Sequence, residues 1–126
     1  MSIIGIGCDI IDLNRLNNVF KKFGKKFLKK ILSKNELNEF LKTKNKINFI
    51  GKRFVIKEAA SKSIGTGFQN GINFKSFELS HDKYGKPNII FLKKAKKIFN
   101  KLKIKYVHVS ITDEKKYIFA VIIIER

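Results

Sequence analysis

Apolar and polar residues alternate at the start of the chain, from Ile3 to Ile10, in the way typical of a β-strand. One face of this strand would carry only apolar side chains, whereas Gly5, Gly7 and Asp9 would lie on the other face. Glycine weakens a strand and usually marks a place where another backbone or a ligand comes close. We therefore expect a close approach at the two glycines, with the Asp9 carboxylate beside it.

Helical spacing of apolar residues begins directly after this strand. The segment Leu13–Leu32 predicts two helices that Gly24 kinks or divides, with Asp12 as the N-cap of the first. This assignment leaves Asp9 without a capping role, although a cap remains the alternative interpretation of that residue. The sequence Ser33-Lys34-Asn35-Glu36 is a capping box, so it predicts a short third helix.

A long central helix is predicted from Asn45 to Ile64, with Gly65 as its stop, because glycine takes the left-handed conformation that ends many helices. Four-residue spacing puts Phe54, Glu58 and Lys62 on one stripe of this helix. The simplest interpretation of Glu58 and Lys62 is a stabilising surface pair, worth about 0.3–0.5 kcal/mol. The alternative is an acid and a base held side by side for chemistry.

The second half of the chain alternates between strand patterns and turns. We expect a glycine-rich loop at residues 65–71, followed by strands at 72–80 and 88–92 on either side of a turn. A helix at 95–102 and a final pair of strands at 104–112 and 117–124 complete the chain. The last strand, Tyr117–Ile124, is apolar on both faces, so it should be central in a sheet or lie in a subunit interface. These elements predict an α+β fold in one domain, residues 1–126, in which a largely antiparallel sheet packs with the long central helix and shorter helices.

Two polar residues of the predicted strand at 104–112 share one face. His108 and Ser110 point to the same side, opposite an aliphatic face. A single histidine on a strand is more often a satisfied structural group than a ligand, so this pattern alone does not select a function.

The charge of the chain predicts an acidic partner. Lysine and arginine number 28 against 10 aspartates and glutamates, a formal net charge of +18. Such a balance predicts attraction to a polyanion: nucleic acid, an anionic membrane or a very acidic protein. A biased genome would also produce many solvated lysines, but their density on the first two helices favours a docking face.

Hydropathy and cysteine content indicate the cell compartment. No apolar run reaches the ~18 residues of a membrane span, and the apolar start of the chain lacks the preceding basic region of a signal peptide. The single cysteine, Cys8, excludes an internal disulfide and fits a reducing cytosol. We therefore expect a cytoplasmic protein.

Two carboxylates and a lysine form the candidate chemistry. The loop Gly65-Thr66-Gly67 is not a P-loop, because it lacks the Gly-Lys-Ser/Thr ending and follows a helix rather than opening one. Mg²⁺ prefers hard oxygen ligands and typically uses one or two carboxylates plus phosphate oxygens of the substrate. Asp9 and Glu58, with Lys62 one turn away, match that requirement if the fold brings them together.

Four ordered motifs resemble those of the 4'-phosphopantetheinyl transferase superfamily. They are Gly5-Ile6-Gly7-Cys8-Asp9-Ile10, the stretch from Gly51 through Lys57-Glu58-Ala59 and Lys62 to Gly67, Gly85-Lys86-Pro87, and His108-Val109-Ser110-Ile111. The chain departs from the pattern at Cys8, where members often have an aliphatic residue, and at Thr112-Asp113, which replaces Ser/Thr-His. The second departure bears on loop contacts and not on the candidate metal pair.

The resemblance implies transfer of 4'-phosphopantetheine from coenzyme A to a serine of apo acyl carrier protein, in fatty acid biosynthesis, with release of adenosine 3',5'-bisphosphate. It implies Asp9 and Glu58 as Mg²⁺ ligands, with Glu58 also accepting the serine proton, directly or through a bound water. Lys62 would hold the diphosphate and stabilise its charge. The coenzyme A cleft would be lined by Arg53, Lys62, Gly65, Thr66, His108 and Ser110.

The resemblance also implies partners. Members are homotrimers with the cleft between subunits, which suits the two-faced strand Tyr117–Ile124. Carrier proteins are strongly acidic, so they would dock on the basic residues Arg15, Lys22, Lys25 and Lys26. The alternative function is a small basic RNA- or ribosome-binding module, motivated by the charge of +18. No RRM, KH or zinc-finger pattern accompanies that charge, so we expect neither nucleic acid nor membrane as a partner.

Overall fold

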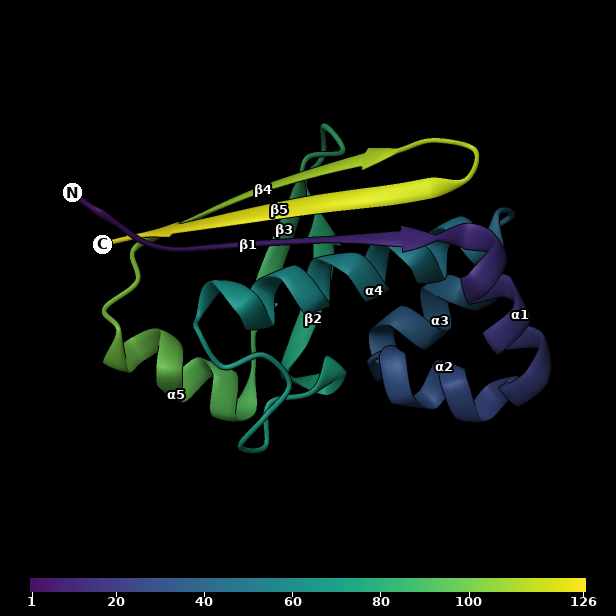
Figure 1. Cartoon of the computed structure of the whole chain (residues 1–126), viewed down its shortest axis with the longest axis horizontal. Coiled ribbons are helices and arrows are strands. Elements are labelled where there is room, and N and C mark those ends of the chain that lie inside the picture. The colour runs from purple at the N-terminus through teal and green to yellow at the C-terminus, as the bar shows by residue number, and fades with distance from the viewer.

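A three-stranded antiparallel sheet covers one side of a long central helix, α4 (Lys46–Ser63), in the computed structural model of residues 1–126 (Figure 1). The strand order is β1 (Ile3–Asp12), β5 (Tyr117–Glu125) and β4 (Tyr106–Asp113). The final strand of the chain is therefore central in this sheet, as its two apolar faces predict. No helix has the length and apolar character needed to cross a membrane.

Three short helices follow β1 and form the end of the molecule opposite the two termini (Figure 1). They are α1 (Leu13–Phe23), α2 (Lys25–Ile31) and α3 (Lys34–Lys42). The local signals predicted in the sequence are all present. Asp12 accepts a hydrogen bond from the Asn14 N–H at 2.8 Å, a left-handed Gly24 separates the first two helices, and the Ser33–Glu36 capping box is formed.

The remaining elements are η1 (Phe74–Ser76), the antiparallel pair β2 (Phe77–His81) and β3 (Pro87–Phe91), and α5 (Lys93–Lys101). The two strands form a second sheet instead of joining the first. The prediction of one strand over residues 72–80 is wrong in its first half, because Asn73 caps a 3₁₀ turn with its side chain. That turn explains the change of phase in the alternation between Phe74 and Phe77.

The two N-terminal glycines let β1 lie directly on the backbone of α4. A side chain at Gly7 would overlap the carbonyl oxygen of Ala59 and come within 2.8 Å of the Ser63 nitrogen. A side chain at Gly5 would overlap the carbonyl oxygen of Ser63. The close approach expected at the glycines is therefore confirmed, and the approaching group is the main chain of the central helix.

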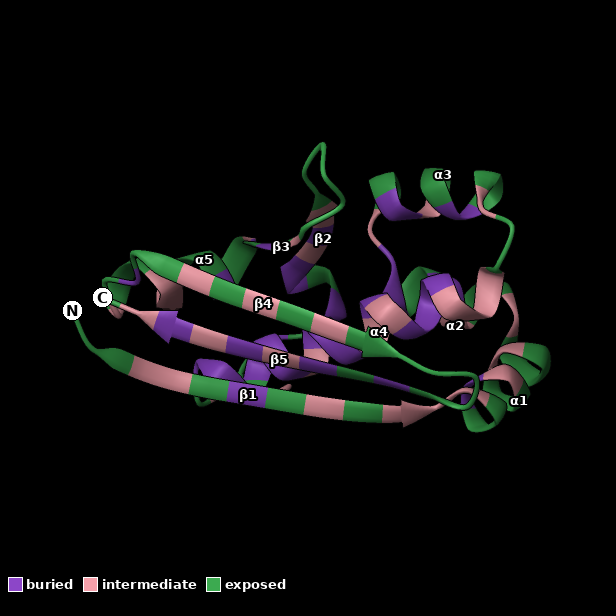
Figure 2. Ribbon diagram, turned by 90° about the horizontal axis from the view of Figure 1, so that it is seen from above, coloured by how far each residue is buried: buried purple, intermediate pink, exposed green.

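The two faces of the three-stranded sheet differ in burial (Figure 2). On the inner face, β5 contributes four fully buried side chains against α4: Ile118, Ala120, Ile122 and Ile124. On the outer face, apolar side chains remain exposed: Ile6 by 64%, Ile10 by 61%, and Tyr106, Tyr117 and Phe119 by 40–48%. The apolar face of β1 thus points away from the core, and the sheet carries an uncovered apolar surface. We call these five residues the outer sheet face.

Candidate active site

The Asp9 carboxylate lies on the inner face of β1, two residues after Gly7, where the strand crosses α4. The Lys62 ammonium, in the last turn of that helix, donates a hydrogen bond to Asp9 Oδ1 at 3.3 Å. The same Nζ donates to the carbonyl oxygen of Cys8 at 3.0 Å. The strand and the helix are therefore joined by a polar contact between two of the three predicted catalytic residues.

Glu58 lies one turn before Lys62 on α4 and lines the same cavity as Asp9. This cavity is bounded by β1, α1, α2 and α4, and its lining residues are Asp9, Ile10, Ile11, Asp12, Arg15, Leu16, Val19, Phe27, Phe54 and Glu58. A second, more open cavity continues from it across Glu58 and is lined by Val19, Phe23, Lys26, Phe27, Lys30, Ile31, Phe54, Glu58 and Phe74. The structure thus brings Asp9 together with Glu58 and Lys62, although Asp9 precedes Glu58 by 49 residues in the sequence.

Electrostatics within the cavity favour a bound cation. Burial raises the pKa of Glu58, and the neighbouring Asp9 charge raises it further. Burial also raises the pKa of Asp9, while Lys62 lowers the pKa of both groups. Two partly buried carboxylates, whose burial disfavours ionisation, are a donor set of hard oxygens that a divalent cation would stabilise. The residues present therefore fit Mg²⁺.

His108 and Ser110 are not brought into this cavity within one chain. Both are exposed on β4, on the opposite face of the sheet from Asp9, and β5 lies between β4 and β1. The His108 ring nitrogen Nε2 lies 2.5 Å from Glu125 Oε1 on β5. Their role in coenzyme A binding stays a prediction.

The other predicted coenzyme A residues occupy two different environments. Arg53 is only 4% exposed, and its guanidinium lies 3.3 Å from Glu39 and 3.5 Å from the centre of the Phe49 ring. Gly65 and Thr66 follow α4 directly, so they lie beside Lys62 at the end of the helix. The cleft-lining role of all three stays a prediction.

Two of the four basic residues predicted to dock a carrier protein line the cavities, and the other two lie exposed on the same helices. Arg15 lines the first cavity and Lys26 the second, while Lys22 and Lys25 are exposed on the same two helices. Sequence reasoning missed the apolar wall between them. Val19, Phe27 and Phe54 border both cavities, but at helical spacing such residues look like ordinary core positions.

Comparison with known proteins identifies the class of protein to which this fold and this cavity belong. Residues 5–122 match the model of the 4'-phosphopantetheinyl transferase superfamily, and the chain belongs to that family. The holo-[acyl-carrier-protein] synthase of Buchnera aphidicola subsp. Baizongia pistaciae is 49% identical over 127 residues, which span 99% of both chains.

Two solved structures show the same fold. The crystal structure of the holo-[acyl-carrier-protein] synthase of Neisseria meningitidis superimposes with a TM-score of 0.94 at 35% identity, over 99% of this chain and 100% of that one. The holo-(acyl-carrier-protein) synthase of Bacillus anthracis in complex with CoA (3',5'-ADP) superimposes with a TM-score of 0.82 at 33% identity, over 98% and 97%. The predicted α+β transferase fold is therefore confirmed.

Proposed function

We propose that the protein transfers 4'-phosphopantetheine from coenzyme A to a serine of apo acyl carrier protein, with Mg²⁺ held by Asp9 and Glu58. Its place would be fatty acid biosynthesis in the cytoplasm. The observation that carries this proposal is that the two carboxylates line one cavity and that Lys62 is hydrogen-bonded to Asp9. The chain that holds this arrangement belongs to the transferase family. The basic RNA- or ribosome-binding alternative has only the net charge in its favour.

The reaction forms one P–O bond and breaks another. The carrier serine oxygen attacks the phosphorus on the pantetheine side of the diphosphate, and adenosine 3',5'-bisphosphate leaves. Bound Mg²⁺ would supply positive charge to the diphosphate oxygens. Glu58 accepts the serine proton, directly or through a water, and its raised pKa brings it closer to working pH as a base.

Lys62 orients and stabilises the diphosphate. Its side chain is 49% exposed, so the ammonium can contact an anion in the cleft while it remains near Asp9. A cation placed in advance stabilises charge that develops on the leaving phosphate without further reorganisation. Catalysis by this site would therefore consist mainly of positioning and electrostatics, as is usual for phosphoryl transfer.

A homotrimer would complete the coenzyme A cleft. The outer sheet face exposes large apolar side chains on all three strands, and such a patch typically marks an association surface. His108 and Ser110 lie on this same face. The proposed intersubunit cleft requires association through this face to bring both residues of one subunit to the Asp9 cavity of a neighbour.

Acyl carrier protein would dock on α1 and α2. Of the four exposed cations on these helices, Arg15 and Lys26 line the cavities that contain Glu58, and Lys22 and Lys25 are exposed beside them in the sequence. Val19 and Phe23 are exposed between them by 38% and 51%, so the surface offers apolar contact inside a basic rim. An acidic helix with a few apolar side chains matches that surface in both respects.

Mass spectrometry of apo acyl carrier protein tests the function. Incubation with coenzyme A and Mg²⁺ should add the mass of one phosphopantetheine group, and chelation by EDTA should prevent the addition. Asp9→Ala and Glu58→Ala should each reduce the rate by at least ~10³-fold without unfolding the chain. Full activity in either variant contradicts the metal pair. Tight, steeply salt-dependent RNA binding without carrier modification would instead support the alternative.

A further inference from the structure

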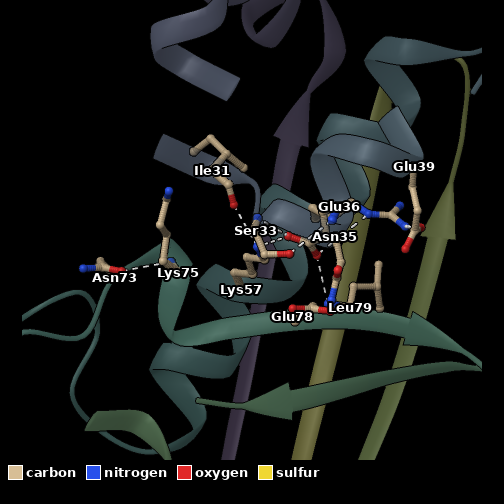
Figure 3. Close-up of polar contacts among 11 residues, drawn as sticks. Ile31, Ser33, Asn35, Glu36, Glu39, Lys57, Asn73, Lys75, Glu78 and Leu79 are labelled. Carbon is tan, nitrogen blue, oxygen red and sulfur yellow. Dashed lines mark hydrogen bonds and ion pairs between the residues drawn. The ribbon is translucent and has the colours of Figure 1, made fainter. Parts of the chain in front are cut away.

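A buried ionic cluster lies on the side of α4 away from the three-stranded sheet (Figure 3). At its centre, the Lys57 ammonium is 2.5 Å from Glu36 Oε1, and both side chains are fully inaccessible to solvent. Lys57 Nζ also donates to the carbonyl oxygen of Ile31 at 2.8 Å. Lys57 directly precedes Glu58 in the sequence, so this cluster is attached to the catalytic helix at the residue beside the proposed metal ligand.

Glu36 connects three elements of the chain, α3, α4 and β2, through one carboxylate. Its Oε1 atom accepts hydrogen bonds from Lys57 and from the Ser33 N–H at 2.9 Å, which completes the capping box of α3. Its Oε2 atom accepts the Leu79 N–H of β2 at 3.0 Å. Arg53, one turn before Lys57, places Nε 4.0 Å from the same oxygen. The carboxylate therefore fixes α4 against α3 and β2, while Lys57 Nζ ties α4 to the end of α2.

Hydrophobic packing alone defines the rotation of α4 poorly. Its buried residues include Phe49, Ile50, Val55, Ile56 and Ala59, which are distributed around most of the helix circumference. A helix that is buried on most sides has no single apolar stripe to define its rotation. A directional polar contact at one residue favours one rotation of α4 about its axis over others, because hydrogen bonds require specific geometry.

A small rotation at Lys57 would change the geometry at Glu58. Successive helix residues are about 100° apart, so Lys57 points to the cluster while Glu58 points to the cavity. A side-chain tip lies ~5–6 Å from the helix axis, and a rotation of ~10° would therefore move the Glu58 carboxylate by about 1 Å. Misplacement of a reacting group by ~1 Å can reduce a rate about 100-fold.

We propose that the buried Glu36–Lys57 ion pair is a positioning device, which sets the rotation of α4 and so holds Glu58 opposite Asp9. Neither residue touches the cavity, so both act through Glu58. This proposal rests on the proposed function, because it gives the ion pair the role of positioning Glu58 in that active site. Buried ion pairs contribute little net stability compared with apolar replacements, whereas removal of one partner alone is strongly destabilising. Specificity of geometry is a reason for a fold to retain such a pair.

The difference between single and double variants separates positioning from stability. Glu36→Gln and Lys57→Met should each lower Tm, because a buried charge loses its partner. The double variant Glu36→Gln/Lys57→Met removes both charges of the pair, leaves Arg53 beside Glu39 and keeps an amide oxygen for the Leu79 N–H, so it should recover part of that loss. Its Mn²⁺ affinity, measured by electron paramagnetic resonance, should nevertheless remain ~10–100-fold weaker than that of the unmodified chain. Its kcat should fall by at least ~10-fold, while KM for carrier protein stays unchanged.

Phe99→Ala is the matched control for stability. Phe99 lies on α5 and packs 5.1 Å from the Phe91 ring, outside the cluster and both cavities. This variant should lower Tm without changing Mn²⁺ affinity or kcat at a temperature where it is folded. If the double variant does not fold, Glu36→Gln, compared with Phe99→Ala at equal folded fraction, gives the same test.

Each outcome decides the proposal. A double variant with unchanged Mn²⁺ affinity and kcat overturns positioning and leaves the proposed function intact. A weakened metal affinity in Phe99→Ala also overturns it, because lost stability would then explain the effect. If the unmodified chain neither binds Mn²⁺ nor modifies carrier protein, the proposed function fails and the positioning role fails with it.

Discussion

The Lys62 ammonium is 3.3 Å from Asp9 Oδ1 and 3.0 Å from the carbonyl oxygen of Cys8, so the last turn of α4 is bonded to β1 at the mouth of the cavity. One lysine thus contacts the strand that carries one candidate metal ligand and follows the other, Glu58, by one helical turn. The charge of Lys62 lowers the pKa of both carboxylates. This geometry makes the titration of the site sensitive to a single substitution.

Lys62→Met should move the acid limb of the pH–rate profile to higher pH. Asp9 and Glu58 must be ionised to bind a divalent cation, and their raised pKa values mean that protons already compete for them above the ordinary carboxyl range. Removal of the lysine raises both pKa values further. A profile of kcat/KM against pH checks this, together with a fall in kcat of about 10²–10³-fold. An acid limb at unchanged pH would show that Lys62 does not act on the carboxylates.

Glu58→Gln should abolish transfer yet leave the chain at least as stable without metal. The pKa of Glu58 is higher in the folded chain than in the unfolded chain, so folding favours the protonated form. Ionisation at neutral pH therefore destabilises the fold, and acidification through this range restores stability at this site. A neutral amide removes the penalty, with an expected rise in Tm of up to a few degrees.

Differential scanning calorimetry at pH 7 in EDTA checks this expectation. Added Mg²⁺ should raise the Tm of the unmodified chain and leave that of Glu58→Gln unchanged, because binding to the native state stabilises it by mass action. A clear fall in Tm for Glu58→Gln in EDTA would mean that the ionised carboxylate makes a favourable contact in the fold.

Gly7→Ala should reduce activity more than its effect on stability explains. The added methyl group would overlap the carbonyl oxygen of Ala59, a backbone atom that cannot rotate away. β1 would have to move from α4, at a stability cost of about 1–3 kcal/mol, and Asp9 would move with it. Chemical denaturation and Mn²⁺ binding measure the two effects. Cys8→Ala, on the exposed face of the same strand, is the control and should change neither.

Charge reversal on the docking helices should weaken carrier binding selectively. Lys22→Glu/Lys26→Glu should raise KM for acyl carrier protein by ~10-fold or more at low salt, with the difference shrinking as ionic strength rises. The matched control is Lys97→Glu/Lys101→Glu on α5, which makes the same change in net charge. Equal effects of the two pairs would assign the attraction to overall charge and not to α1 and α2.

Disruption of the outer sheet face should separate the subunits. Phe119 is 40% exposed in the middle strand of the sheet, so Phe119→Lys places a charge in the proposed interface while the core stays intact. Analytical ultracentrifugation should show a trimer for the unmodified chain and smaller species for the variant. A monomer that retains full transferase activity would remove the need for His108 and Ser110 from a neighbour.

Local chemistry made much of this fold predictable. The signals that begin and end helices involve only residues close in sequence, so their effects follow from the sequence. Asp12, Gly24 and the Ser33 capping box are of this kind. The meeting of Asp9 with Glu58 was also indicated, because Gly5 and Gly7 signal that something must lie against β1. Nothing local identifies α4 as that neighbour, and the resemblance to a family provided the missing connection.

Other features depend on contacts that no local pattern reveals. Glu36 was assigned only to the capping box and Lys57 only to a family motif, yet the two form a buried pair across 21 residues. The sequence predicted one apolar face of β1 but not its environment, and Ile6 and Ile10 face outward because the glycine side of the strand meets the helix. In these cases, the burial of a side chain depends on which distant element packs against it in the folded chain.

The contact between the glycines of β1 and the backbone of α4 has an evolutionary consequence. Where two main chains touch, the spacing between them is set by the thickness of peptide groups, which is the same in every sequence. Exposed side chains can change towards lysine, isoleucine and asparagine without altering the distance between β1 and α4. Two residues without side chains thereby make the separation of strand and helix independent of the surface composition, and leave only the rotation of α4 to buried side chains.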